Sequence, residues 1–115
     1  MDSKSPIFAA EPDAATLRVG LSQVVAAQAF GIALADLRAP GRGDRGAALA
    51  RQVAMYLSHV VFAMPAAVVA KAFGRERSTA SHAVRRIEAL RDDPALDRTL
   101  CRLEGMLRSA TEAVR

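Results

Sequence analysis

The segment from Phe73 to Ile87 constrains the fold of this chain more than any other part of the sequence. It reads Phe-Gly-Arg-Glu-Arg-Ser-Thr-Ala-Ser-His-Ala-Val-Arg-Arg-Ile, so a glycine is followed by apolar residues at helical spacing. Gly74 can adopt the positive φ of a tight turn between two helices. The face opposite the apolar residues carries arginine, serine and histidine. The pattern predicts the turn and second helix of a helix-turn-helix motif.

The apolar spacing of the whole chain predicts about five helices and a short helical turn, and it predicts no strand. With four Phe, one Tyr and no Trp, the core must be filled by Ala, Leu, Val and Met, which suits helix-on-helix packing. We therefore expect an all-α helical bundle. The predicted helices span 14–30, 47–62, 65–72, 77–91 and 95–113, and the short turn begins near residue 33.

Two apolar stripes lead to expectations about packing. The residues that fall near one face of the first helix, which we expect to be buried, are Leu17, Leu21, Val24, Val25 and Gln28 or Ala29. In the last helix, leucines repeat at intervals of four, three and four residues. They could form a homodimer interface or close the core of the monomer, and the second use is favoured. These leucines are Leu96, Leu100, Leu103 and Leu107.

One domain is expected, because the chain has 115 residues. Residues 1–13 contain two prolines and no helical periodicity, so we predict a flexible tail followed by a domain over 14–115. No signal peptide or membrane span is apparent. The single Cys101 cannot form an internal disulfide, and its spacing from the two histidines does not suggest a metal site. We expect a cytoplasmic, nucleoid-associated protein that holds no metal or cofactor.

Positive charge is concentrated in the middle of the chain. Residues 41–91 hold nine basic and three acidic side chains, whereas the remainder holds seven basic and nine acidic ones. The middle segment therefore carries a net charge of +6 and the remainder −2, which gives the total of +4. Such a distribution favours a polyanionic partner, double-stranded DNA above all. A solvated, arginine-rich surface without a partner remains the alternative.

The glycine-rich segment 38–46 is a predicted loop that carries Arg42 and Arg45. It could be a basic arm that reads the minor groove, or only a connector. In the predicted second helix of the motif, Glu76, Arg77 and Ser78 are candidate base contacts. Candidate phosphate contacts flank them or follow on the same face. These candidates are Arg75, Thr79, His82 and Arg85.

Several segments together resemble the C-terminal DNA-binding domain (domain IV) of the bacterial replication initiator DnaA. The resemblance covers about residues 15–108 and rests on the blocks Val24–Ile32, Asp-Leu at 36–37, Ala-Arg-Gln-Val-Ala-Met-Tyr-Leu at 50–57, Ala-Phe-Gly-Arg at 72–75 and His-Ala-Val-Arg-Arg-Ile-Glu at 82–88. It implies a Trp-repressor-like helical fold that recognises the DnaA box. It also implies phosphate contacts by Arg51, Gln52 and His59, and a minor-groove contact by Arg42 or Arg45.

The recognition segment departs from the family pattern. Glu76 replaces an aspartate, Arg77 a histidine and Ser78 a threonine, and one glycine of the turn is missing. Because these are base-reading positions, they imply a changed or relaxed preferred sequence. The chain also lacks the Walker sequences of the DnaA ATPase.

These observations lead to two expectations about function. We expect a stand-alone, sequence-specific DNA-binding regulator of replication or transcription that has no ATPase activity. The alternative is a protein-interaction module of the replication machinery that has lost specific DNA reading. An enzyme is not expected, because no nucleophile pair or metal-ligand spacing is evident.

Overall fold

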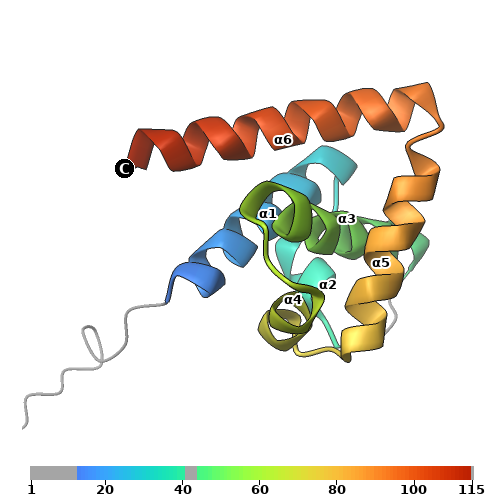
Figure 1. The fold of residues 1–115 in the computed structure, drawn as a ribbon. Coiled ribbons are helices and arrows are strands. Elements are labelled where there is room, and N and C mark those ends of the chain that lie inside the picture. Colours follow the sequence, from blue (N-terminus) through green and yellow to red (C-terminus); the bar gives the residue numbers. More distant parts are fainter. Residues whose placement is uncertain (1–12, 41–43, 115) are drawn as a thin grey trace, which may run out of the picture.

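The computed structural model describes residues 13–40 and 44–114, and all regular secondary structure within these ranges is helical (Figure 1). The expected all-α bundle is therefore confirmed, and the short turn near residue 33 is a helix of its own. Of the predicted tail over 1–13, only Asp13 belongs to the described residues. The helices are α1 (Ala14–Phe30), α2 (Leu34–Arg38), α3 (Arg45–Phe62), α4 (Ala66–Phe73), α5 (Arg77–Leu90) and α6 (Pro94–Val114).

Aspartate side chains fix the starts of helices α1 and α3. Asp13 Oδ1 accepts a hydrogen bond from the Thr16 amide, and Asp44 Oδ1 accepts one from the Ala47 amide, both at 2.8 Å. Each carboxylate thus satisfies one of the amide groups that have no partner at a helix start. Because Asp44 caps α3, this helix begins at Arg45, two residues before the predicted start.

Glycine ends α1 and α4, as the sequence predicts. Gly31 and Gly74 both adopt a φ of 66°, which a residue with a Cβ atom rarely adopts. Their amide groups donate to carbonyls of the last helical turn. Pro65 is the N-cap of α4 and does not form part of its first turn. Helices α1 and α4 therefore end at glycines, whose positive φ allows the chain to change direction.

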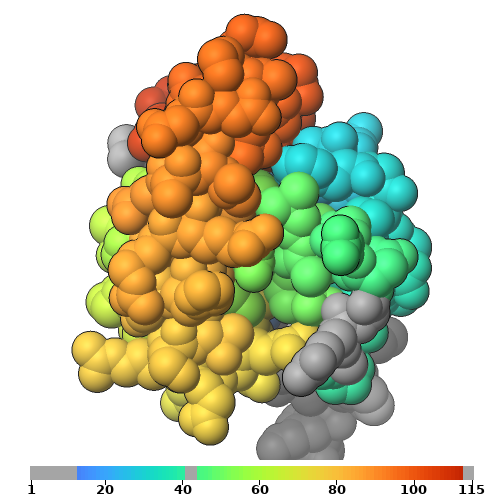
Figure 2. Space-filling view, turned by 90° about the vertical axis from the view of Figure 1, so that its right-hand side faces the viewer, coloured from blue at the N-terminus to red at the C-terminus, as the bar shows by residue number. Residues whose placement is uncertain are grey.

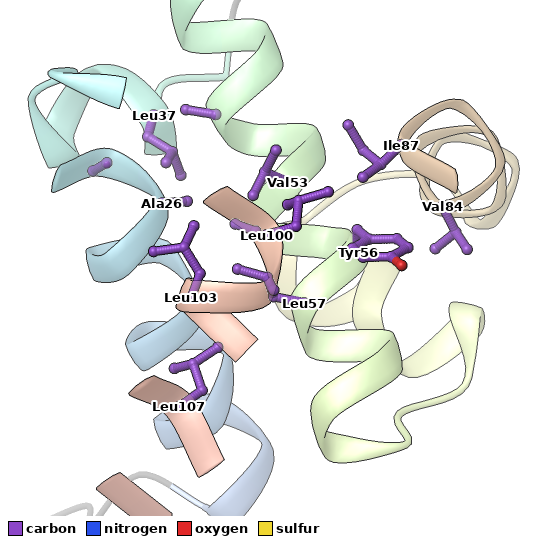
Figure 3. Close-up of a cluster of buried hydrophobic side chains, with 13 residues drawn as sticks. Ala26, Leu37, Val53, Tyr56, Leu57, Val84, Ile87, Leu100, Leu103 and Leu107 are labelled. Carbon is purple, nitrogen blue, oxygen red and sulfur yellow. The ribbon is translucent and has the colours of Figure 1, made fainter. Parts of the chain in front are cut away.

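Helix α3 forms the centre of the bundle and packs mainly against α1 and α5 (Figure 1). Helix α4 packs mainly against α5, and α6 crosses one end of the bundle. Figure 3 shows side chains from α1, α2, α3, α5 and α6 meeting in one apolar cluster. The labelled members are Ala26, Leu37, Val53, Tyr56, Leu57, Val84, Ile87, Leu100, Leu103 and Leu107.

The leucines of α6 complete this core. Leu100, Leu103 and Leu107 are at most 2% exposed, and Leu96 packs partly buried against the same cluster. Of the two uses that the sequence allows, the structure shows the closure of the monomer core. These leucines are already buried within the monomer, so they are not available on its surface to form a homodimer interface.

The expectation for α1 is only partly correct, because Val25 and Ala29 pack partly buried against the core whereas the other apolar residues of the predicted face do not. Leu17, Leu21 and Val24 are 56%, 39% and 46% exposed. The buried face of α1 is made of smaller or polar side chains, because α1 packs closely along α3, which presents Ala50 and Ala54 at the contact. Small residues allow two helix axes to approach, so packing outweighs the hydrophobicity of the leucines. The buried residues of α1 are Val19, Ser22, Gln23, Ala26 and Ala27.

Arg91 joins the end of α5 to α6 and α3. Its guanidinium donates to Asp97 Oδ1 and Glu104 Oε2, both at 2.6 Å, and to the Tyr56 hydroxyl at 3.0 Å. Burial opposes the charged form, but the hydrogen bonds from Arg91 to Tyr56, Asp97 and Glu104 outweigh it and raise the pKa of Arg91. This network fixes the turn into α6.

Within the described part of the chain, no helix is long and apolar enough to cross a membrane.

Candidate nucleic-acid interface

Helices α4 and α5 form the helix-turn-helix that the sequence predicts. The Arg75 amide donates to the Ala70 carbonyl at 2.8 Å and the Gly74 amide to the Lys71 carbonyl at 3.1 Å, so the chain reverses directly after α4. Val69 and Ala70 of α4 lie in one buried cluster with alanines of α5. These contacts set the angle between the two helices. The buried residues of α5 are Ala80, Ala83, Val84 and Ile87.

The exposed face of α5 carries the predicted DNA contacts. Side chains at the start of the helix and one and two turns further along are all exposed, and none of them is used to hold the core. Figure 2 shows α5, in yellow and light orange, on the same face of the molecule as the green first half of α3. The predicted contacts that the structure shows to be exposed here are Glu76, Arg77, Ser78, Thr79, His82 and Arg85.

Glu76 is the N-cap residue of α5, but its side chain makes no capping hydrogen bond. The carboxylate of glutamate is one methylene further from the backbone than that of aspartate, which is a preferred N-cap residue. The first amide groups of α5 therefore point out of the helix without a side-chain acceptor. Together with the helix dipole, such amides attract an anion such as a phosphate.

Arg51 is buried at 7% exposure, and its guanidinium is bound to backbone carbonyls. Nε donates to the Leu37 carbonyl at 2.8 Å, and Nη2 donates to the Asp36 carbonyl at 3.3 Å. Burial, followed by repulsion from Arg75, lowers the pKa of Arg51. Arg51 thus attaches α2 to α3. The phosphate contact that the family resemblance implies for it stays a prediction.

Arg75 is half-buried, and its Nη2 donates to the Ala39 carbonyl at 2.9 Å. Arg51 Nη2 lies 3.5 Å from the same carbonyl oxygen. Arg75, which precedes the N-cap residue of α5, is therefore tied to the segment that follows α2. A phosphate contact by Arg75 would have to compete with this bond, and it too stays a prediction.

His59 lies in the last turn of α3, where its Nδ1 is 2.8 Å from the Met64 carbonyl oxygen. The ring thereby supports the end of α3, at which Ala63 adopts a φ of 54°. At a rise of about 1.5 Å per residue, His59 is about 21 Å along the helix axis from Arg45. The structure does not bring these two predicted contacts together, and the phosphate contact of His59 remains untested.

The remaining predicted contacts lie at or near the start of α3. Arg45 is exposed at the first position of this helix, and Gln52 is half-buried in its second turn. Arg42 lies outside the described residues. Sequence reasoning missed Arg38, whose Nε donates to Gln23 Oε1 at 2.8 Å. Its position beside the basic loop was the only available signal, because only the fold shows that it lies close to Arg51 and Arg75.

A comparison with protein families agrees with this geometry. The family model for the bacterial DnaA protein helix-turn-helix matches residues 22–87, which is more than half of the chain. The match begins within α1 and ends within α5, so it contains α2, α3, the whole of α4 and the exposed face described above. The DnaA resemblance expected from the sequence is confirmed. The chain belongs to the bacterial DnaA helix-turn-helix family, and its fold is that of a DNA-binding domain.

Proposed function

We propose that this protein binds double-stranded DNA in a sequence-specific manner and thereby regulates replication or transcription. The observation that carries the proposal is the exposed polar face of α5, held on a helix-turn-helix of the DnaA family. In this motif the second helix enters the major groove and presents its first residues to the bases. None of the exposed side chains at the start of α5 contributes to the core, so they are available for DNA.

Arg77, Ser78 and Glu76 are the proposed major-groove contacts. A guanidinium can bind guanine O6 and N7 together, a hydroxyl can donate or accept, and a carboxylate can accept from cytosine N4. Arg42 or Arg45 is proposed to reach the minor groove beside this site. Because Arg77 and Ser78 differ from the histidine and threonine of the family pattern, we propose a preferred site that is related to the DnaA box but not identical to it.

The proposed phosphate contacts surround the base-reading residues. Thr79 follows them directly, and His82 and Arg85 continue along the exposed face of α5. Gln52 approaches from the second turn of α3. Such contacts position the protein on the duplex without reading the sequence. They also make binding depend on salt, because each neutralised phosphate releases counterions.

Selection of random duplexes by the purified protein tests the proposal. The enriched duplex and a scrambled control are then titrated across a salt series. Enrichment of a motif together with a steep salt slope supports a sequence-specific reader. A palindromic motif would indicate two copies related by a two-fold axis. The absence of binding to any duplex at low salt would refute the proposal and favour the protein-interaction alternative.

Two substitutions on α5 separate base reading from charge. Arg77→Ala should weaken binding to the selected site by about 1–3 kcal/mol and relax the preference at one base position. Arg86→Ala is the matched control, because Arg86 is also exposed on α5 but lies about half a turn away around the helix axis. Equal losses for both variants on every duplex would contradict base reading by Arg77.

A further inference from the structure

A cavity of about 370 Å³ lies between α1, the end of α2, the start of α3 and the end of α4. Three arginines line it, namely Arg38, Arg51 and Arg75, and each comes from a different segment of the chain. No acidic residue is among the residues that line it. Its volume falls in the range of small-ligand sites. The cavity is thus large enough for a small ligand, and all the charged side chains that line it are positive.

None of the three cavity arginines forms a salt bridge among the described residues; Arg51 is buried, Arg75 half-buried and Arg38 exposed. The salt bridges among the described residues lie outside the cavity and are formed by Arg91 and Arg108. Arg51 is buried with carbonyl oxygens as its partners, and repulsion from Arg75 adds to burial in lowering its pKa. Buried charges in proteins are normally paired, because leaving one uncompensated is costly. An anion in the cavity would supply the missing partner.

The donors are arranged around a common space. The Nη2 atoms of Arg51 and Arg75 meet at the Ala39 carbonyl oxygen, at 3.5 and 2.9 Å. Arg38 Nε donates to Gln23 Oε1, and Arg38 Nη2 is 4.0 Å from where a Cβ atom on Gly20 would be; Gln23 and Gly20 also line the cavity. Guanidinium groups bind phosphate oxygens in pairs through parallel N–H groups.

We propose that this cavity binds a small phosphate-type oxyanion, either inorganic phosphate or the phosphoryl group of a small molecule. The buried side chains of Leu37 and Val19 are also among the residues that line the cavity, beside the three arginines. Arg51 and Arg75 are also among the expected DNA phosphate contacts, so the cavity adjoins the proposed DNA-binding surface, and its occupancy by a small anion can be measured without DNA.

Occupancy of the cavity would act on both DNA-binding elements. Ala39 directly follows α2 and lies in the predicted basic loop 38–46, and Arg75 directly precedes Glu76, the N-cap residue of α5. An anion that draws the two guanidinium groups away from the Ala39 carbonyl therefore changes how both segments are anchored. The site is placed where a small phosphorylated molecule would alter DNA binding.

The test is a titration of the full chain with inorganic phosphate and with pyrophosphate, followed by the backbone amide signals in NMR spectra. Chloride at equal ionic strength controls for screening. We expect saturable shifts at Gly20, Gln23 and Ala39. Arg38→Gln should weaken binding about tenfold, as the loss of one charge-assisted hydrogen bond predicts. Arg102→Gln, which removes an exposed arginine of α6, should leave it unchanged.

A second variant places a carboxylate at the cavity. Thr16 is exposed and lines the cavity, so Thr16→Glu should abolish the phosphate-induced shifts while the protein stays folded. Thermal unfolding checks the folded state of every variant. Phosphate shifts confined to the exposed face of α5, or equal effects of Arg38→Gln and Arg102→Gln, would overturn the proposal. So would shifts of the cavity signals with duplex DNA but not with phosphate, because the cavity would then belong to the DNA interface.

Discussion

The substitution Arg51→Met separates two roles that the sequence and the structure give to this side chain. The family resemblance implies a phosphate contact, whereas the structure shows a buried guanidinium that holds the Leu37 and Asp36 carbonyls. Methionine retains an unbranched apolar stem of similar length and removes the donors. If Arg51 mainly attaches α2 to α3, the variant should lose stability. If it mainly binds phosphate, the variant should keep its stability and lose affinity for DNA.

The expected loss of stability follows from the bonds that disappear. A hydrogen bond from a charged donor contributes about 1.5–3 kcal/mol, and the Nε bond to Leu37 is short and buried. Removing a buried charge and its repulsion from Arg75 offsets part of this loss. We therefore expect the free energy of unfolding to fall by about 1–3 kcal/mol. For a domain of this size, that corresponds to a decrease of about 5–15 °C in Tm.

The assay is thermal and urea unfolding of Arg51→Met, with Arg98→Gln on α6 as a control for the loss of one exposed positive charge. DNA affinity is measured across a salt series for the same proteins. A stability within about 0.5 kcal/mol of the parent protein, combined with a salt slope that falls by about one, would refute the structural role. It would instead support a phosphate contact by Arg51.

Three smaller perturbations test other details. Ser22 Oγ is buried and has no hydrogen-bond partner among the described residues, so Ser22→Ala should stabilise the protein by about 1 kcal/mol in thermal unfolding; a loss of stability would show that the hydroxyl is satisfied. Glu76→Asp should add the missing cap of α5 and stabilise it by about 0.5–1 kcal/mol, and an unchanged Tm would count against this geometry. Hydrogen bonds from Thr16 lower the pKa of Asp13, so its contribution is present above the unfolded-state pKa and is lost as the pH falls through the folded-state pKa. Helicity followed by circular dichroism should therefore lose part of its acid sensitivity below about pH 4 in Asp13→Asn, and an identical acid transition would contradict the role of the charge.

Among the candidate site residues, local sequence was a good guide wherever a side chain acts alone on an exposed surface. Arg77 and His82 lie on the exposed face of α5 because Ala80 and Ile87 define the opposite, buried face of the same helix. Local sequence was no comparable guide for Arg38, whose relation to Arg51 depends on how α2 folds against α3. Long polar side chains at helix junctions are therefore the least predictable part of the site.

The helices, the turn at Gly74 and the family could be predicted from the amino-acid sequence, because capping, glycine geometry and apolar spacing act over a few residues. The rotation of each helix about its axis and the partners of its long side chains depend on how the helices pack together. Leu21 is exposed on α1 because the small residues of this helix allow closer packing on α3. Arg51 points into the protein because folding brings the Leu37 carbonyl within reach of its guanidinium. Both outcomes depend on contacts between segments far apart in the chain, which no local pattern encodes.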